Sequence, residues 1–215
     1  MKRLIREEEI REAAKKNINI TVDDETVITP SARDLAKELS VVFVTGKEKY
    51  EHENYVSRVI NKWPFNKVAI ASDHGGFYLK EELKTFLRDK DYMVIDLGPA
   101  NNKACDYPDF ALKVATHVSE GKADCGIMVD SVGIGSAMVA NRVPGILAAK
   151  CNNGTEAKSA REHNYANVLT LGSMIVGSTL AKDIVTAFLT TKGGAERHQK
   201  RVAKILEYEN KRNLK

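Results

Sequence analysis

The chain has 215 residues, of which 43% are apolar and 29% are charged, a composition typical of a globular protein and unlike that of a disordered chain. Its formal net charge of +4 comes from basic residues interleaved with acidic ones, so the sequence does not indicate a nucleic-acid-binding stripe. No apolar run reaches the roughly 18 residues of a membrane-spanning helix, and the N-terminus turns acidic from Glu7 to Glu9 where a signal peptide needs an apolar stretch, so we expect a cytoplasmic protein without membrane contacts.

Residues 1–65 form a charged segment that we predict to be a small α+β extension of the main domain. Residues 7–16 have the pattern of a short helix, and residues 18–22 have that of a strand. A second helix is expected to begin at Thr29–Pro30, because threonine caps a helix N-terminus and proline in the first turn loses no hydrogen bond. The apolar, β-branched residues 41–44 follow as another strand.

This N-terminal extension resembles the small N-terminal elements of several enzymes associated with bacterial microcompartments. The resemblance implies that residues 1–65 are an interaction or assembly segment that recruits the chain to a microcompartment. We favour the other interpretation, a strand-and-helix addition that packs against the main domain or against a neighbouring subunit, over a dedicated targeting module.

Strands and helices alternate from Lys67 onward. The expected strands are residues 68–71, 93–98, 125–129, 145–149 and 168–171, and the expected helices are residues 78–89, 110–119 and 178–190, the last being the closing helix. Strands separated by helices pair in parallel through right-handed crossovers. We therefore predict that residues 66–215 form a Rossmann-like α/β domain, a three-layer α/β/α sandwich with a five-stranded parallel sheet.

Ligands of such sheets bind at the carboxyl ends of the strands, where three turns of this chain are expected to meet. These turns are residues 72–76, residues 98–99 and residues 130–136. Gly133 and Gly135 allow backbone N–H groups to approach an anion at the start of the following helix. The third glycine and the downstream acidic residue of a dinucleotide-binding fingerprint are absent, so a nicotinamide-dependent dehydrogenase is disfavoured.

Polar side chains in the chain suggest acid–base chemistry without a cofactor. His74 lies in a turn between small residues, His163 precedes the fifth strand, and His198 lies close to two arginines. The three cysteines form no CxxC pair and are interpreted as free thiols, so we predict no metal and no cofactor.

Six motifs follow one another in the main domain: SDHGG from Ser72, DYPDFA from Asp106, GKADCGI from Gly121, VGIGSAMVAN from Val132, REHNYANVL from Arg161 and ERHQKRV from Glu196. Together they resemble the family of ribose-5-phosphate isomerase B and galactose-6-phosphate isomerase, from about Lys67 to Tyr208. The resemblance implies an aldose–ketose isomerase that acts on a sugar phosphate through an enediolate. It also implies a homodimer or a larger assembly such as a tetramer, with each site built between two subunits.

The same resemblance assigns roles to residues of this chain. His163 assists ring opening, and Asn164 binds a sugar hydroxyl. Asp73 and His74 contact the sugar and its phosphate end. Further substrate-binding residues are Tyr107, the arginines Arg197 and Arg201 that clamp the phosphate, and the turn residues Ser131, Val132, Gly133, Ile134 and Gly135, whose backbone holds the enediolate oxygens.

Position 130 departs from the ribose isomerases, whose proton-abstracting cysteine corresponds to Asp130. Ser131 and Val132 replace a glycine and a threonine, and Met174 replaces a basic residue. The Asp-x-x-Gly-x-Gly form is similar to the A subunit of galactose-6-phosphate isomerase. Cys125 lies five residues before the turn, inside a strand, and is expected to be packed in the core.

Three hypotheses follow from this departure. Asp130 is itself the catalytic base, because burial beside a sugar can raise the pKa of a carboxyl group toward the working pH. Alternatively, the chain is the A-type partner in a hetero-oligomer with a cysteine-containing homologue. In the third hypothesis, it binds sugar phosphates without turnover.

Overall fold

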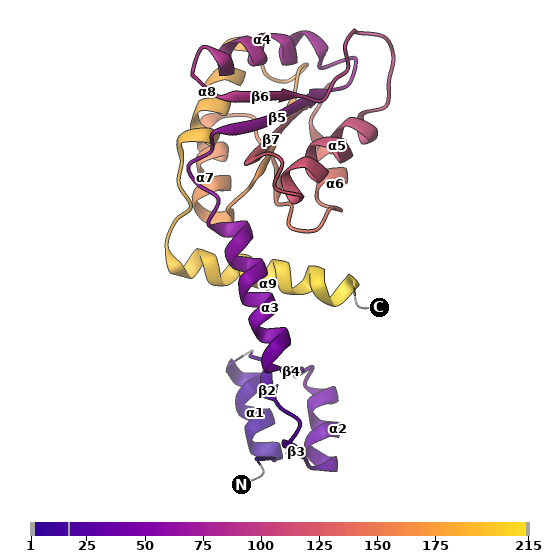
Figure 1. Cartoon of the computed structure of the whole chain (residues 1–215), viewed down its shortest axis with the longest axis vertical. Helices are drawn as coiled ribbons and strands as arrows, with labels where there is room; N and C mark the ends of the chain where they lie inside the picture. Colours follow the sequence, from indigo (N-terminus) through magenta and orange to yellow (C-terminus); the bar gives the residue numbers. More distant parts are fainter. Residues whose placement is uncertain (1–2, 17, 214–215) are drawn as a thin grey trace. The chain divides into compact units, whose positions relative to one another are not determined.

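Figure 1 shows the computed structural model of the chain, which describes the backbone of residues 3–16 and 18–213 and their side chains except those of residues 49–52 and 210–213. The chain forms two compact units, Met1–Tyr55 and Val56–Lys215. The boundary falls inside the helix α3 (Gly46–Ile60). Within the described part of the chain, no helix combines the length and the apolar character needed to cross a membrane.

The first unit consists of two consecutive strand–helix–strand segments. Its elements are β1 (Leu4–Ile5), α1 (Glu7–Lys16), β2 (Ile20–Val22), β3 (Val27–Ile28), α2 (Pro30–Glu38) and β4 (Phe43–Thr45). β1 pairs in parallel with β3, where Leu4 lies opposite Val27. β2 pairs in parallel with β4, where Ile20 lies opposite Phe43. The separation along the chain between the opposite residues is the same in both pairs of strands. The second segment therefore repeats the architecture of the first, which the sequence pattern did not predict.

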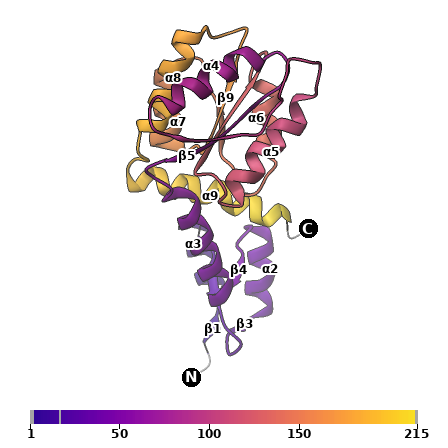
Figure 2. The same ribbon diagram turned by 45° about the horizontal axis from the view of Figure 1, so that its top comes forward.

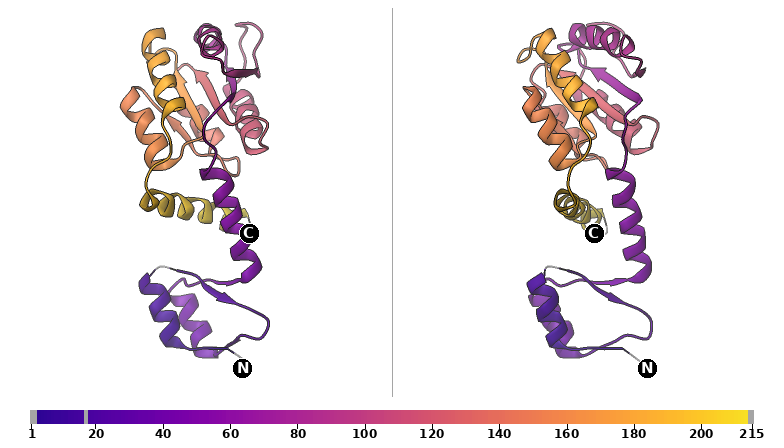
Figure 3. Two further views of the ribbon diagram at one scale, coloured as in Figure 1. Left: turned by 60° about the vertical axis from the view of Figure 1, so that its left-hand side comes forward. Right: turned by 90° about the vertical axis from the view of Figure 1, so that its left-hand side faces the viewer.

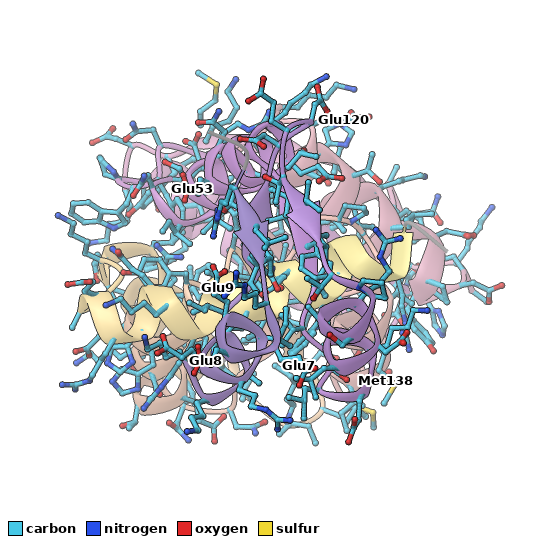
Figure 4. The ribbon with its side chains drawn as sticks, turned by 90° about the horizontal axis from the view of Figure 1, so that it is seen from below. Glu7, Glu8, Glu9, Glu53, Glu120 and Met138 are labelled. Carbon is cyan, nitrogen blue, oxygen red and sulfur yellow. The ribbon has the colours of Figure 1, made fainter. Side chains whose placement is uncertain are left out.

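Local chemistry explains both helices of this unit. The three glutamates Glu7, Glu8 and Glu9, labelled in Figure 4, lie in the first turn of α1, where the positive end of the helix dipole favours them. The side chain of Thr29 accepts a hydrogen bond from the backbone N–H of Ala32 at 3.3 Å and caps α2, as expected. One face of each helix is buried in the core of the unit, which contains Ile5, Ile10, Ala13, Ile20, Ala32, Leu35 and Ala36.

The second unit is a parallel α/β domain. Its elements are β5 (Lys67–Ser72), α4 (Phe77–Arg88), β6 (Met93–Asp96), α5 (Tyr107–Ser119), β7 (Cys125–Asp130), α6 (Ile134–Ala140), β8 (Ala148–Lys150), α7 (Gly154–Asn164), β9 (Val168–Gly172), α8 (Ser178–Thr190) and α9 (Glu196–Asn213). The five strands are all parallel, in the order β6-β5-β7-β9-β8.

Two apolar layers hold the helices against this sheet. Val68 and Ile70 of β5 pack with α4, α7 and α8 on one face. The alternating Ala69 and Ala71 pack with α5 and α6 on the other face. Figure 2 shows α5 and α6 on one side of the strands and α7 and α8 on the other. The predicted α/β/α sandwich is confirmed.

The ends of the strands define two edges of the sheet. The chain leaves each strand at the carboxyl edge, and the crossover helices return it to the amino edge. The helix α9 is anchored at the amino edge, because the Glu209 carboxylate accepts a hydrogen bond at 3.1 Å from the N–H of Gly145, which precedes β8. The Tyr165 hydroxyl, just before β9, donates to the carbonyl of Gly194 at 2.6 Å, just before α9. Figure 3 shows α9 at this end of the unit.

Several features of this unit differ from the sequence prediction. The second strand ends at Asp96 instead of Gly98, and the helix α7 was not expected. The expected closing helix, α8, is followed by α9, a charged helix whose buried apolar side chains in the described range are Val202 and Leu206. The fourth strand begins at Ala148 instead of Gly145. Side chains hold the backbone at the start of this strand. The side-chain amide oxygens of Asn167 and Asn141 accept hydrogen bonds from the N–H groups of Leu147 and Ala148, respectively, each at 2.9 Å.

Candidate functional site

The turn after β7 has a shape that depends on two glycines. Gly133 has a left-handed conformation with φ = 85° and immediately precedes α6. Gly172, at the end of the neighbouring β9, must lack a side chain because a Cβ atom there would lie 2.6 Å from the carbonyl oxygen of Val132. The hydroxyl of Thr170 donates to the carbonyl of Gly133 at 2.7 Å. The turn is thus fixed by its neighbouring strand before any ligand binds.

Asp130 ends β7, is 5% exposed, and accepts four hydrogen bonds, two from the turn and two from Ser136 of α6. Oδ1 accepts hydrogen bonds from the backbone N–H groups of Val132, at 2.7 Å, and of Gly133. Oδ2 accepts hydrogen bonds from the backbone N–H of Ser136, at 3.3 Å, and from the hydroxyl of the same serine. A carboxylate has about four lone-pair positions, so all of them are engaged. The hydroxyl of Ser136 is the one donor that can rotate away.

The turn keeps three backbone N–H groups for a ligand. Two of the N–H groups assigned from the resemblance, those of Val132 and Gly133, are directed at Asp130. Among the described residues, none accepts a hydrogen bond from the N–H groups of Ser131, Ile134 or Gly135. The positive end of α6 adds to their attraction for a negative oxygen.

His74 and Asp73 lie in the turn after β5. Nδ1 of His74 lies 3.1 Å from the carbonyl oxygen and 3.3 Å from the backbone nitrogen of Cys105, so the ring is held and Nε2 remains for a substrate. The carboxylate of Asp73 accepts the N–H of Gly76 at 2.9 Å. The hydroxyl of Ser173 donates to the carbonyl of Gly75 at 2.8 Å and ties this turn to the end of β9.

Tyr107 completes the group of residues at the carboxyl edge. It is the first residue of α5, and its side chain is 38% exposed. Its phenol lies against Gly135, since a Cβ atom on that glycine would be 2.7 Å from the tyrosine hydroxyl. The structure thus brings together the predicted residues Asp73, His74, Tyr107, Asp130 and those of the turn from Ser131 to Gly135.

The remaining predicted residues form a second group at the amino edge. His163, near the end of α7, stacks on His198 of α9, with ring centroids 4.4 Å apart. Nδ1 of His163 lies 3.1 Å from the hydroxyl of Ser159, which leaves Nε2 free. Burial, together with the charges of His163, Arg197 and Arg201, lowers the pKa of His198.

The two arginines and Asn164 lie beside this pair of histidines. Arg197 and Arg201 are exposed, and no carboxylate of the described part of the chain lies within 4 Å of either guanidinium group. Asn164 is the last residue of α7 and is exposed. Two uncompensated guanidinium groups beside an imidazole form a suitable site for a phosphate.

A single chain keeps these two groups at opposite edges of the sheet. The helix α7 starts just after β8, at the carboxyl edge, and ends just before β9, at the amino edge. His163 and the arginines therefore cannot reach the turn at Asp130 of the same chain.

The sequence interpretation missed two parts of the site. Ser136 was not singled out, because its contact with Asp130 depends on the shape of the turn between them. The segment around Cys105 was missed because its contact with His74 uses backbone atoms. The cysteine side chains give no sign of a catalytic thiol in the core, since burial raises the pKa of Cys125 and raises that of Cys151 to about 11.

The geometry provides no assembled metal centre. In the described ranges, no three His, Cys, Asp or Glu side chains are grouped so that they could hold a metal ion. The chemistry that these residues supply consists of acid–base side chains, backbone N–H donors and guanidinium groups.

Comparison with known proteins gives one consistent family. The profile of the ribose/galactose isomerase family matches residues 68–205. The structure of ribose-5-phosphate isomerase B from Clostridium thermocellum is 49% identical, with a TM-score of 0.67, and the match covers 67% of this chain and 98% of that one. The enzyme from Mycoplasma genitalium with bound ribulose-5-phosphate is 42% identical, with a TM-score of 0.65 and coverage of 67% and 96%.

A curated relative represents the galactose branch of the family. The galactose-6-phosphate isomerase subunit LacA of Streptococcus mutans is 41% identical over 135 residues, which are 63% of this chain and 94% of the relative. The family profile starts at residue 68, so the first unit lies outside the family match.

Proposed function

The chain belongs to the ribose/galactose isomerase family, and we propose that it interconverts an aldose phosphate and the corresponding ketose phosphate through an enediolate. The observation that carries this proposal is the group of residues at the carboxyl edge. There a carboxylate, an imidazole and three unpartnered backbone N–H groups surround the glycine turn. These are the groups that proton transfer beside a carbonyl requires.

In the proposed reaction, Nε2 of His163 transfers a proton to open the sugar ring. Asp130 then removes the proton beside the carbonyl and returns it to the former carbonyl carbon, while the hydroxyl proton of the neighbouring carbon passes to the former carbonyl oxygen. Since all lone-pair positions of Asp130 are engaged, the hydroxyl of Ser136 must turn away to make room on Oδ2. The free N–H groups of Ser131, Ile134 and Gly135 stabilise the enediolate oxygens.

We propose that the active form is a homodimer or a larger homo-oligomer in which each site joins the carboxyl edge of one subunit to the amino edge of another. The opposite positions of the two groups support this arrangement. Exposed apolar side chains around the turn, a feature typical of subunit contacts, also support it: Val132, Ile134, Met138, Met174 and Ile175, from 40% to 80% exposed. Met138, labelled in Figure 4, belongs to α6.

The substrate in this proposal is a five- or six-carbon aldose phosphate, with its phosphate held by Arg197 and Arg201. Ribose 5-phosphate is the first compound to test, because the Mycoplasma genitalium relative holds ribulose-5-phosphate. Such anionic sugars are retained inside cells, so we place the enzyme in the cytoplasm. Association with a microcompartment through residues 1–65 remains a separate proposal.

The test is an isomerase assay of the purified full chain with ribose, allose and galactose phosphates, together with calorimetric binding of each. Turnover of one of them by the homomeric protein is expected. In Asp130→Asn, kcat is expected to fall about 10²- to 10⁴-fold, and binding is measured beside it because Asp130 also holds the turn. Binding without turnover, restored by a cysteine-containing homologue, would favour the A-type hetero-oligomer instead. Absence of binding by all three sugars would overturn the proposal.

A further inference from the structure

Lys80 is a buried lysine that the proposed reaction does not use. It lies on α4 with 0% of its surface exposed. A buried ammonium group costs several kcal/mol unless it is fully paired. Here its Nζ lies 2.7 Å from Oε1 of Glu81, 3.2 Å from Oδ1 of Asp96 and 2.9 Å from the carbonyl oxygen of Pro99. Its three N–H donors thus have three acceptors.

Lys84, one helical turn later, shares two of these partners. It pairs with Glu81 at 2.8 Å and with Asp96. Burial would raise the pKa of Asp96, but the hydrogen bonds from Lys84, from the N–H of Gly98 and from Lys80 outweigh it and lower that pKa. The two lysines and two carboxylates balance in charge. Only Lys80 reaches the backbone of Pro99.

The carbonyl of Pro99 lies at the start of the segment that joins β6 to α5. Gly98 is fixed on both sides, because its N–H donates to Asp96 at 3.0 Å and its carbonyl accepts the N–H of Ser72 at 3.0 Å. Ser72 directly precedes Asp73 and His74 in the turn after β5. The anchor at Lys80 is therefore connected to that turn through a single backbone hydrogen bond.

The other end of the segment contacts the proposed site directly. The backbone of Cys105 bonds to Nδ1 of His74, and Tyr107 lies against Gly135. Between the two ends, residues 100–104 are exposed. Its middle is attached through an exposed hydrogen bond, since the side-chain amide of Asn102 donates to the hydroxyl of Tyr78 on α4 at 3.0 Å. The position of the segment therefore depends chiefly on its buried anchor at Pro99.

We propose that Lys80 is a positioning residue for the isomerase site: by holding the carbonyl of Pro99, it sets the position of the segment from Pro99 to Tyr107 and, through it, of His74 and Tyr107. This inference rests on the proposed function for its kinetic consequence. Its structural consequence, the position of the segment, is independent of catalysis.

Lys80→Met and Lys84→Met form a matched pair of variants. Each removes one buried ammonium group and leaves Asp96 and Glu81 one lysine partner, so similar losses of thermal stability are expected. Only Lys80→Met releases Pro99. Because His74 and Tyr107 contact substrate in both the ground state and the transition state, its KM is expected to rise about tenfold with little change in kcat. Lys84→Met is expected to keep the KM of the wild type.

Cys105 provides a readout that does not depend on activity. It is the partly exposed thiol, whereas Cys125 and Cys151 are buried. Its rate of reaction with a thiol reagent is expected to increase at least about threefold in Lys80→Met and to stay unchanged in Lys84→Met, because local opening of the segment exposes it. If Lys80→Met does not fold, Lys80→Gln, which keeps a shorter donor, is measured in the same way.

Equal Cys105 reactivity in the two variants would overturn the positioning role, whatever the activity. Increased reactivity without any isomerase activity, even in the wild type, would overturn the proposed function and leave the structural role of Lys80 intact. An equal rise of KM in both variants would show that the charge cluster acts only through general stability and would also overturn the proposal.

Discussion

Mixing two inactive variants tests whether each site is shared between subunits. Asp130→Asn removes the proposed base at the carboxyl edge, and His163→Asn removes the ring-opening group at the amino edge. Each variant alone is expected to lose at least about 10²-fold in kcat. Because the two residues lie at opposite edges of one chain, a mixed dimer has one site that lacks both groups and one site in which both are intact.

The recovered activity follows from this pairing. Random assembly of equal amounts gives mixed dimers for about half of the population, and half of their sites are intact, so about a quarter of the wild-type activity returns. The assay is the isomerisation rate of the unseparated co-expressed oligomers, compared with each variant alone. Mixed dimers selected through two different affinity tags are expected to show about half of the wild-type activity, because half of their sites are intact.

A second mixture provides the control. Tyr107→Phe and Asp130→Asn both alter the carboxyl edge, so every site of their mixed dimer keeps one defect and no activity above that of the separate variants is expected. Recovery in this control, or no recovery with Asp130→Asn and His163→Asn although mixed oligomers form, would refute the shared site.

Three further predictions concern stability and the first unit. In Gly76→Ala, the new Cβ atom would lie 2.2 Å from the carbonyl oxygen of Val129, so the free energy of unfolding, measured by chemical denaturation, is expected to fall by about 3 kcal/mol or more; a loss below about 1 kcal/mol would contradict the geometry. The lowered pKa of Asp96 stabilises the fold at pH values above 3.8, the ordinary pKa of this group, and this stabilisation is lost as the pH falls through the pKa of the folded state. Asp96→Asn is therefore expected to be less stable than the wild type at neutral pH, and the difference in stability is expected to shrink below pH 3.8. Removal of residues 1–55 is expected to leave kcat within about twofold, because the family match starts at residue 68; an insoluble product would show that the first unit has a structural role.

The order of the elements was predictable because buried parallel strands have apolar residues on both faces. Val68, Ala69, Ile70 and Ala71 serve both apolar layers of the sheet, and a continuous apolar run indicates such a strand. The helix α9 has no such apolar run at its ends, since its buried Val202 and Leu206 lie in the middle of an 18-residue helix of mostly charged and polar residues. The strands β1 and β3 have two residues each, too few to form a pattern.

The edge on which some site residues lie was also implicit in the sequence. Residues that follow a strand reach the carboxyl edge, as Asp130 does, and residues that precede a strand lie at the amino edge, as His163 does. The location of Arg197 and Arg201 could not be derived this way. It depends on the path of α9, which is set by contacts such as that between Glu209 and Gly145, far apart in the sequence.

The aspartate at position 130 and the serine at position 136 depend on each other in this chain. Four donors converge on position 130, two of them from the turn and two from Ser136. A carboxylate can accept all four, whereas an asparagine amide would present two donors of its own and a thiol is a weak acceptor. The same carboxylate that is proposed to remove the substrate proton therefore also holds the turn in shape, so replacing it changes the geometry of the turn as well as the base. For this reason, Asp130→Asn requires a binding measurement beside the kinetic one: retained binding assigns the loss of kcat to proton transfer, and lost binding assigns it to the turn.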